Sequence, residues 1–382
     1  MTITVQNKEI PVLLLTGYLG SGKTTLVNRI LNNREGIRFA VIVNDIGEVN
    51  IDADLIQKGG VVGMGDDSLI PLQNGCICCT LKMDLVGQVD SLCRIGKFDY
   101  IVIEASGICE PAPIAQTICS IPKLVPEYAR RNTPKLDCIV TVVDALRMKD
   151  EFGCGEALNR PGIEEDDLES LVIQQVEFCN VVLLNKASEV SPEELGLLRG
   201  IIKSLNPQAK VYECDYGDVD LGLILSTGLF DFDKVATSAA WIAAIEGEEE
   251  ELHNEESGEA LEYNISTHVY CRRPALDLNK FDYMVSKKWP EGIIRAKGLC
   301  YFADEWDKCY LFEQSGSSKS IKEAGLWFVT MPEEQLEEMM RRDPVLRRDW
   351  DPFYGDRMQK IVFIGRNMDT GLIDSLMDSC LE

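Results

Sequence analysis

The sequence predicts an α/β protein in which a doubly wound, mostly parallel sheet is followed by a second, smaller α+β domain. Three observations support this fold class. Short apolar runs alternate with helical patterns through the first 232 residues. A glycine-rich loop follows the first of these runs. A glutamate-rich segment at 246–259 then separates this part from a differently patterned remainder.

The strands of the first domain are expected at short apolar runs, because parallel strands buried on both faces need no polar alternation. These runs are 10–15, 38–43, 99–104, 137–143, 180–184 and 210–213. Helices are expected between them, notably at 23–33, 166–178 and 192–204. The last helix has Ser191 as its N-cap, Pro192 at its first position and acidic residues in its first turn. Alternating strands and helices predict a sheet covered on both faces.

The second domain follows a segment that holds eight glutamates in residues 246–259 and that we interpret as a solvated linker. We therefore divide the chain into a domain at 1–232, a linker at 233–262 and a domain at 263–382. In the last domain, strands are predicted at 263–271, 292–303, 308–314 and 324–329, and helices near 277–288, 332–341 and 369–380.

The charge balance argues against a nucleic-acid partner. The chain has 63 acidic and 38 basic residues, and the formal net charge of −25 repels phosphate backbones. No basic run offers a patch for a membrane surface. The first apolar run is too short for a signal peptide or a spanning helix. We expect a cytoplasmic protein that binds neither nucleic acid nor a membrane.

The 14 cysteines are scattered, apart from a trio at 76–79. A chain of this length does not depend on a disulfide framework, so a reducing compartment is expected. Five of the scattered cysteines are interpreted as small core residues, namely Cys93, Cys119, Cys138, Cys179 and Cys300.

Residues 17–24 match the phosphate-loop pattern in full, with a predicted strand before them and a predicted helix after them. In such a loop, backbone N–H groups and the helix N-terminus cradle phosphates. The pattern therefore predicts a P-loop nucleotide hydrolase. Lys23 should reach the β- and γ-phosphate oxygens, and the Thr24 hydroxyl should ligate Mg²⁺. The nucleotide-binding residues predicted here are Gly17, Gly20, Ser21, Gly22, Lys23, Thr24 and Thr25.

Two further strand ends complete the predicted catalytic site. The run 99–104 ends in Glu104, the expected second carboxylate on the metal side. Gly107 follows it and would let a backbone N–H approach the γ-phosphate. Asp45 and Glu48 follow the run 38–43, where a switch loop belongs, and Asp45 would sense Mg²⁺ or position water. The predicted catalytic residues are Lys23, Asp45 and Glu104, and the predicted Mg²⁺ ligands are Thr24, Asp45 and Glu104.

Asn185 and Lys186 close the run 180–184, where a base-recognition loop would lie, and both are predicted to bind nucleotide. The guanine-reading pattern is Asn-Lys-x-Asp, and its aspartate accepts two hydrogen bonds from guanine. Here the fourth position is Ser188, followed by Glu189. Serine offers one neutral acceptor, and the charge-assisted pair is worth about 1 kcal/mol more. Guanine selectivity should weaken unless Glu189 or the backbone replaces the aspartate.

Cys76, Cys78 and Cys79 form a cluster of soft metal ligands. Adjacent cysteines point in different directions, so we expect two or three thiolates and an outside ligand, for which Glu48 is the candidate. A ligand that moves with the γ-phosphate would make metal affinity depend on the nucleotide. A vicinal redox pair at Cys78–Cys79, an iron–sulfur site and buried structural cysteines are the alternatives.

Four segments together resemble the CobW-type GTPases of metal homeostasis, relatives of the urease and hydrogenase nickel-insertion GTPases. They are GYLGSGKTT, VNDIGEVNID, NGCICCTLKMDL and IEASGICEP, in the order and spacing of that family. The segments GIIRAKGLCYFAD and QKIVFIGRNMDTGLIDSLMDSCL resemble its C-terminal domain. The resemblance implies Mg²⁺-assisted GTP hydrolysis and delivery of zinc, cobalt or iron. A His-rich stretch frequent in the family is replaced here by glutamates.

The predicted function is that of a slow, metal-stimulated GTPase that carries Zn²⁺, Co²⁺, Fe²⁺ or Ni²⁺ at the cysteine cluster. It would pass the metal to a client metalloprotein through the C-terminal domain. Because Ser188 replaces the guanine-reading aspartate, ATP is an alternative substrate. A dimer that forms in response to nucleotide or metal is a further alternative. Three rivals are a small-molecule phosphotransferase with a structural zinc, a regulatory binding module, and an activator of one metalloenzyme such as nitrile hydratase.

Overall fold

The computed structural model describes nine stretches of the chain, and every structural statement below concerns these residues. They are 9–32, 36–43, 69–71, 82–124, 132–150, 168–231, 264–315, 318–342 and 344–382. The chain divides into two compact units, one built on a seven-stranded sheet and one on a five-stranded sheet. Each unit is described by itself.

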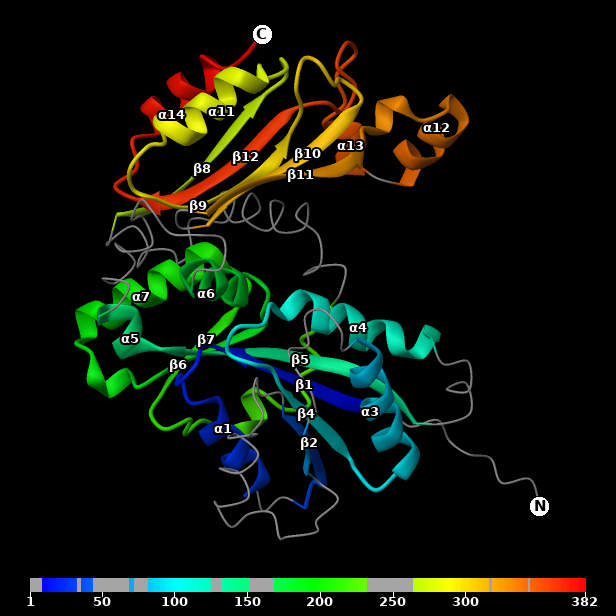
Figure 1. The fold of residues 1–382 in the computed structure, drawn as a ribbon, viewed down its shortest axis with the longest axis vertical. Helices are drawn as coiled ribbons and strands as arrows, with labels where there is room; N and C mark the ends of the chain where they lie inside the picture. Colours follow the sequence, from blue (N-terminus) through cyan, green and yellow to red (C-terminus); the bar gives the residue numbers. More distant parts are fainter. Residues whose placement is uncertain are drawn as a thin grey trace. The chain divides into compact units, whose positions relative to one another are not determined.

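The first unit contains a seven-stranded sheet in the order β3-β2-β4-β1-β5-β6-β7 (Figure 1). Every pairing between neighbouring strands of this sheet is parallel. The strands are β1 Glu9–Gly17, β2 Phe39–Val43, β3 Leu69–Pro71, β4 Tyr100–Glu104, β5 Thr133–Asp144, β6 Val181–Asn185 and β7 Lys210–Cys214. The six predicted strands are confirmed, and β3, which is only three residues long, was not predicted.

Helices cover both faces of this sheet (Figure 1), as its continuous apolar strands require. They are α1 Lys23–Leu31, α3 Lys82–Ile95, α4 Pro111–Leu124, α5 Ala145–Asp150, α6 Leu168–Glu177 and α7 Pro192–Leu205. Figure 1 places α1 on one face and α4 on the other. Leu26, Val27 and Ile30 of α1 are fully buried against Leu13 and Leu15 of β1. The fold class is therefore a P-loop-type α/β domain, as predicted.

The N-terminus of α7 has Ser191 as its N-cap, as the sequence predicts, and the contacts there form a capping box. Ser191 Oγ accepts a hydrogen bond from the Glu194 backbone N–H at 3.3 Å, and the Ser191 backbone N–H donates to Glu194 Oε2 at 2.8 Å. The hydrogen bond from the Ser191 backbone lowers the pKa of the Glu194 carboxyl. Two amides that the helix itself leaves unpaired are satisfied in this way.

The second unit contains a five-stranded antiparallel sheet in the order β11-β10-β9-β12-β8. Its strands are β8 Ile265–Arg272, β9 Ile293–Cys300, β10 Lys308–Ser315, β11 Ser318–Leu326 and β12 Gln359–Arg366. Its helices are α11 Leu278–Lys287, α12 Glu333–Arg342, α13 Pro344–Arg348 and α14 Thr370–Asp378. The predicted α+β character is confirmed.

Helices α11 and α14 cover one face of this sheet (Figure 1). Phe281 of α11 packs edge-on against Phe312 of β10, with ring centroids 5.3 Å apart. On α14, Asp374 contacts His268 Nε2 at 2.7 Å, and Asp378 accepts a hydrogen bond from the Tyr270 hydroxyl at 2.8 Å. Both partners lie on β8, so these contacts fix the position of α14 along that strand.

The strand predicted at 324–329 is wrong in its second half. β11 runs from Ser318 to Leu326, and Phe328–Thr330 form a 3₁₀ turn. β11 is an exposed edge strand, so its polar sequence carries no apolar signal. Trp327 contributes to the apolar run, but its side chain is buried at the turn and not in a strand. Its indole N–H donates to the Lys308 carbonyl at 3.0 Å.

Ten cysteines lie in the described residues, and all of them are free thiols. Of the five interpreted as core residues, Cys93, Cys138, Cys179 and Cys300 are buried, and Cys119 is half-buried. Burial raises the pKa of the first three thiols to about 12 and raises the pKa of the Cys300 thiol as well. Burial therefore disfavours the thiolate form of these cysteines, as expected for core residues.

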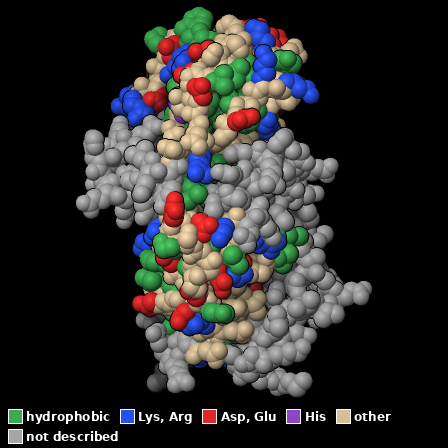
Figure 2. Space-filling model, turned by 90° about the vertical axis from the view of Figure 1, so that its left-hand side faces the viewer, with side chains coloured by type: hydrophobic (Ala, Val, Ile, Leu, Met, Phe, Trp, Pro, Cys, Tyr) green, Lys and Arg blue, Asp and Glu red, His purple; other side chains and the backbone are tan. Residues whose placement is uncertain are grey.

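On the face drawn in Figure 2, acidic and basic side chains lie interspersed over the described residues. The glutamate-rich segment 246–259 lies outside them. The domain limits at 232 and 263 remain predictions. No helix of the described residues is long and apolar enough to cross a membrane.

We predict that Ser191→Ala lowers the free energy of unfolding of the first unit by about 1 kcal/mol, because an N-cap side chain of α7 is lost. Ser204→Ala is the matched control in the same helix. The Ser204 hydroxyl only donates back to the Gly200 carbonyl at 2.9 Å, so its loss should be nearly neutral. Urea unfolding followed by circular dichroism measures both, and equal effects would contradict the prediction.

Candidate functional site

The residues singled out in the sequence meet at the carboxyl edge of the seven-stranded sheet. Because all pairings are parallel, every strand ends at this edge. The register pairs Leu15 with Glu104, Asp144 with Asn185, and Asn185 with Cys214. β1 lies in the middle, between β4 and β5, so the loop after β1 opens where the connections diverge to either side of the sheet. Open α/β sheets bind ligands at this point.

The loop after β1 is shaped by its glycines. Gly17, Gly20 and Gly22 have φ angles of 132°, 79° and 108°, a region that residues with a side chain rarely adopt. A Cβ on Gly17 would lie 2.3 Å from the Val142 carbonyl oxygen, and one on Gly22 would lie 2.4 Å from Asn185 Nδ2. Gly22 also stands at the N-cap of α1 without a side-chain cap. The first amides of α1 are thus left for a ligand, as a phosphate site requires.

Lys23 is buried, with only 6% of its surface exposed, and its ammonium group folds back over the loop. Lys23 Nζ donates to the carbonyls of Gly17 at 2.8 Å and Tyr18 at 3.0 Å. These bonds place a positive charge inside the ring of loop amides. The predicted phosphate-binding lysine therefore lies in the loop that it should serve.

Thr24 and Glu104 meet across 80 residues of sequence. The Thr24 hydroxyl donates to Glu104 Oε1 at 3.1 Å, and Glu104 is 1% exposed. A hydroxyl and a carboxylate form a hard-oxygen pair of the kind that Mg²⁺ prefers. Ser21 Oγ, also buried, makes no hydrogen bond to the described residues. The donor set and the glycine cradle both fit a Mg²⁺–nucleotide complex.

Gly107 packs against the phosphate loop. A Cβ at this position would lie 2.6 Å from the Leu19 backbone nitrogen and 2.7 Å from Leu19 Cγ. The segment after β4 therefore approaches the loop more closely than any other residue type would permit. This contact links the Glu104 strand end directly to the loop after β1.

Asn185 and Lys186 lie at the same edge but make contacts that sequence reasoning did not foresee. Asn185 is buried, and its Nδ2 donates to the Ser21 carbonyl at 2.8 Å. Asn185 Oδ1 accepts from the Gly217 N–H at 3.1 Å. Lys186 has a left-handed backbone, with φ of 59°, and its ammonium group pairs with Asp144. Asn185 thus joins two loops.

Ser188 does not stand alone at the fourth position of the base-recognition pattern. Its backbone N–H and its hydroxyl both donate to Asp215 Oδ1, at 3.1 and 2.9 Å. Asp215 follows β7, and sequence reasoning missed it because nothing in the linear pattern connects it to Ser188. The parallel pairing of Asn185 with Cys214 was the missing information.

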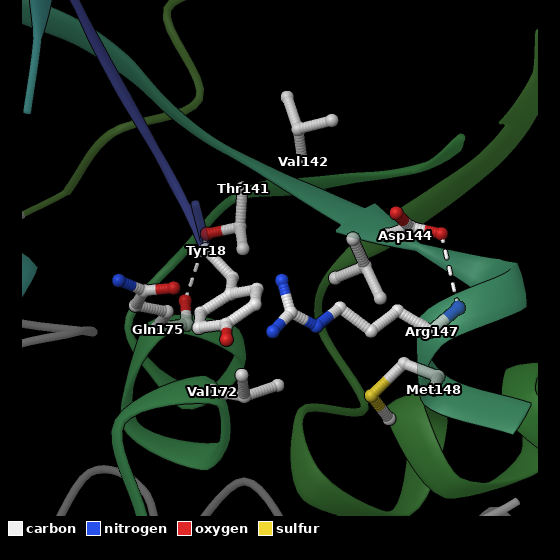
Figure 3. Close-up of a pocket in the computed structure, with 9 residues that line it drawn as sticks. Tyr18, Thr141, Val142, Asp144, Arg147, Met148, Val172 and Gln175 are labelled. Carbon is white, nitrogen blue, oxygen red and sulfur yellow. Dashed lines mark hydrogen bonds between the residues drawn. The ribbon is translucent and has the colours of Figure 1, made fainter. Parts of the chain in front are cut away.

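A pocket next to the phosphate loop contains a second residue that the sequence did not reveal (Figure 3). The Arg147 guanidinium lies 3.9 Å from the centre of the Tyr18 ring and donates to the Leu19 carbonyl at 3.1 Å. Asp144 Oδ1 accepts from the Arg147 backbone N–H at 3.1 Å, which orients the start of α5. Arg147, in α5 after β5, therefore contacts the same loop that Gly107 approaches from the segment after β4.

Asp45, Glu48, Cys76, Cys78 and Cys79 lie outside the described residues. Within the described residues, no group of three or more His, Cys, Asp or Glu side chains is placed to hold a metal ion. The predicted metal ligands therefore remain predictions.

Comparison with known proteins agrees with this geometry. The family model described as CobW/HypB/UreG, nucleotide-binding domain, matches residues 11–213, and the cobW C-terminal domain matches residues 265–381. The zinc-regulated GTPase metalloprotein activator 1 of Dictyostelium discoideum is 35% identical over 98% of this chain and 80% of its own length. The zinc chaperone YjiA of Escherichia coli is 35% identical over 60% of this chain and 65% of its own length. A crystal structure of Zn(II)-bound YjiA covers 98% of this chain and 100% of its own, at 22% identity and a TM-score of 0.43.

We predict that Gly107→Ala lowers nucleotide turnover at least about tenfold, because the added methyl group must displace Leu19 from the phosphate loop. Gly87→Ala is the control, since a Cβ there meets nothing within 4 Å. Steady-state phosphate release from both variants tests this. Wild-type turnover in Gly107→Ala would show that the close approach is not needed.

Proposed function

The chain belongs to the CobW/HypB/UreG family of GTPases, and we propose that it couples GTP hydrolysis to the delivery of a transition metal, with zinc as the first candidate. The names of the relatives, a zinc-regulated activator and a zinc chaperone, support the choice of metal. Cobalt, iron and nickel are the competing cargoes, because thiolate-rich sites bind all of them.

The proposed coupling between nucleotide and metal rests on the register of β2 with β3 and β4. Val43, the last residue of β2, is the register partner of Glu104 on β4 and of Pro71 on β3. The segment with Asp45 and Glu48 begins directly after Val43, and Cys76 follows Pro71 by five residues. Both segments therefore leave the sheet at the edge where Thr24 meets Glu104. We propose that a change at the γ-phosphate is transmitted to both segments through these strand ends.

For hydrolysis, we assign phosphate binding to the loop amides and the Lys23 ammonium group. Thr24 and Glu104, with Asp45, would hold Mg²⁺, which when bound neutralises charge on the phosphate oxygens. Asp45 would also position the attacking water. Arg147 and Gly107 keep the loop in shape.

For the cargo, we assign Cys76, Cys78 and Cys79 as thiolate ligands and Glu48 as the ligand that responds to the nucleotide. Since Glu48 belongs to the same segment as Asp45, ordering of that segment by GTP and Mg²⁺ would complete the metal site. Hydrolysis would release the segment and lower the affinity for the metal. The site would thus hold cargo in one nucleotide state and free it in the other.

The remaining parts of the proposal concern partners and location. The domain at 263–382 would bind the client metalloprotein, and 233–262 would link it to the GTPase domain. We also propose a reducing, cytoplasmic setting, because a chain of this length does not depend on a disulfide framework. A dimer that depends on nucleotide or metal is consistent with this scheme.

We predict that Zn²⁺ binds at least about fivefold more tightly when the full chain holds a non-hydrolysable GTP analogue than when it holds GDP. Linkage requires that Zn²⁺ strengthen binding of the GTP analogue relative to binding of GDP by the same factor. Competition with a chromophoric zinc chelator measures the first quantity, and fluorescent nucleotide titration measures the second.

Cys78→Ser should lower the zinc affinity and abolish the difference between the two nucleotide states. Cys271→Ser is the matched control, because Cys271 is an exposed free thiol on the other unit. Equal zinc affinities with the two nucleotides in the wild-type chain would refute the coupling.

We also predict that Glu104→Gln raises the Mg²⁺ concentration for half-maximal GTPase activity at least about tenfold, since the amide keeps the shape but loses the charge. Thr24→Ser keeps the hydroxyl and should change little. GTPase turnover measured at a series of Mg²⁺ concentrations tests this prediction. An unchanged Mg²⁺ requirement in Glu104→Gln would mean that Glu104 is not a Mg²⁺ ligand.

A further inference from the structure

We propose that Asp215, in the loop after β7, supplies the carboxylate that recognises guanine. It would replace the aspartate of the Asn-Lys-x-Asp pattern, whose position holds Ser188 in this chain. The inference rests on the GTP hydrolysis included in the proposed function, but not on the metal cargo. It assigns base specificity to a loop that carries no recognised motif.

The first argument is the position of Asp215. β6 and β7 are parallel neighbours, and Asn185 pairs with Cys214, so the residues that follow them emerge side by side. Asn185 Nδ2 donates to the Ser21 carbonyl in the phosphate loop, and Asn185 Oδ1 accepts from the Gly217 N–H. One side chain therefore fixes the loop after β7 relative to the phosphate loop. Asp215 lies two residues from that fixed point.

The second argument is the contact with Ser188. Asp215 Oδ1 accepts hydrogen bonds from both the backbone N–H and the hydroxyl of Ser188. A carboxylate thus stands directly beside the position where the guanine-reading pattern has its aspartate. Oδ2 of Asp215 makes no hydrogen bond within the part of the chain that the structure describes, and the side chain is half-buried.

The turn that carries Asp215 is held in place before any ligand binds. Tyr216 and Gly217 both have left-handed backbones, with φ of 53° and 64°. Arg29 Nε donates to the Tyr216 carbonyl at 3.0 Å, which ties the turn to α1. A recognition group on a prearranged turn loses little conformational entropy on binding.

The chemistry of the base then selects guanine. Guanine presents two adjacent donors, N1–H and the exocyclic amine, and a carboxylate accepts from both. Adenine presents an acceptor at N1, which a carboxylate repels. Sites built on such hydrogen bonds discriminate strongly, because a wrong base leaves buried polar groups unpaired. Ser188 then acts as a positioning residue that orients Asp215.

Two other acids near the site are poorer candidates. Asp218 forms an ion pair with Arg29 at 2.6 Å and is 71% exposed. Glu189 ends a 3₁₀ turn, where its backbone N–H donates to the Lys186 carbonyl at 3.1 Å, and its side chain is exposed. Neither carboxylate accepts a hydrogen bond from Ser188 among the hydrogen bonds found in the described residues. These two residues provide the matched controls.

The test measures affinities of the full chain for GDP, ADP and xanthosine diphosphate, with Mg²⁺ and without transition metal. Asp215→Asn should weaken GDP binding at least about tenfold, because charge-assisted hydrogen bonds are lost. The same variant should bind xanthosine diphosphate more tightly than the wild type does, because an amide N–H can donate to the extra carbonyl of xanthine. Asp218→Asn and Glu189→Gln should leave the preference unchanged.

The double variant Ser188→Asp with Asp215→Ser exchanges the pair and should restore GDP binding to within about threefold of the wild type. Equal losses for GDP and xanthosine diphosphate in Asp215→Asn would mean a structural role and overturn the proposal. Loss of guanine preference only in Glu189→Gln would also overturn it, as would a wild type that binds ADP as well as GDP. Because no cargo metal is present, failure of metal coupling leaves this result unaffected.

Discussion

The hydrogen bonds of the Asn185 side chain hold the site together. Its amide nitrogen donates to Ser21 in the phosphate loop, and its oxygen accepts from Gly217 after β7. Gly22 permits this contact, because a side chain there would occupy the position of the amide. Three segments that are distant in sequence are thereby joined at one edge of the sheet. The proposed phosphate, Mg²⁺ and base subsites all lie at that edge.

The same edge explains why charged groups can be buried at this site. Lys23 and Glu104 are both almost fully buried, and a buried charge is stable only with partners. Lys23 bonds to loop carbonyls, and Glu104 accepts from Thr24. These groups are therefore arranged for the charges of a nucleotide before it binds, which lowers the reorganisation that catalysis requires.

The second unit depends on different forces. Its antiparallel sheet has one face covered by α11 and α14, and its interior combines aliphatic side chains with a cluster of aromatic rings. Ionic and hydrogen-bonded contacts of Asp374 and Asp378 with β8 fix the last helix. β11 leaves a polar, exposed edge, which is the composition that discourages unwanted strand pairing. A domain of this kind can present surfaces to a partner without rearranging its core.

The sequence by itself determined the parts of this protein that depend on local pattern. Apolar runs identified six of the seven parallel strands, the N-cap serine with its proline and first-turn acids identified the start of α7, and the glycine spacing identified the loop around Lys23. β3, β12 and most of β11 escaped prediction. For β3 and β11 the reason is that a three-residue strand and a polar edge strand carry no periodic signal. No linear sequence pattern predicted the contacts between neighbouring strand ends. Only the tertiary structure placed Asp215 beside Ser188 and Arg147 over Tyr18, because parallel pairing gathers strand ends that lie far apart along the chain.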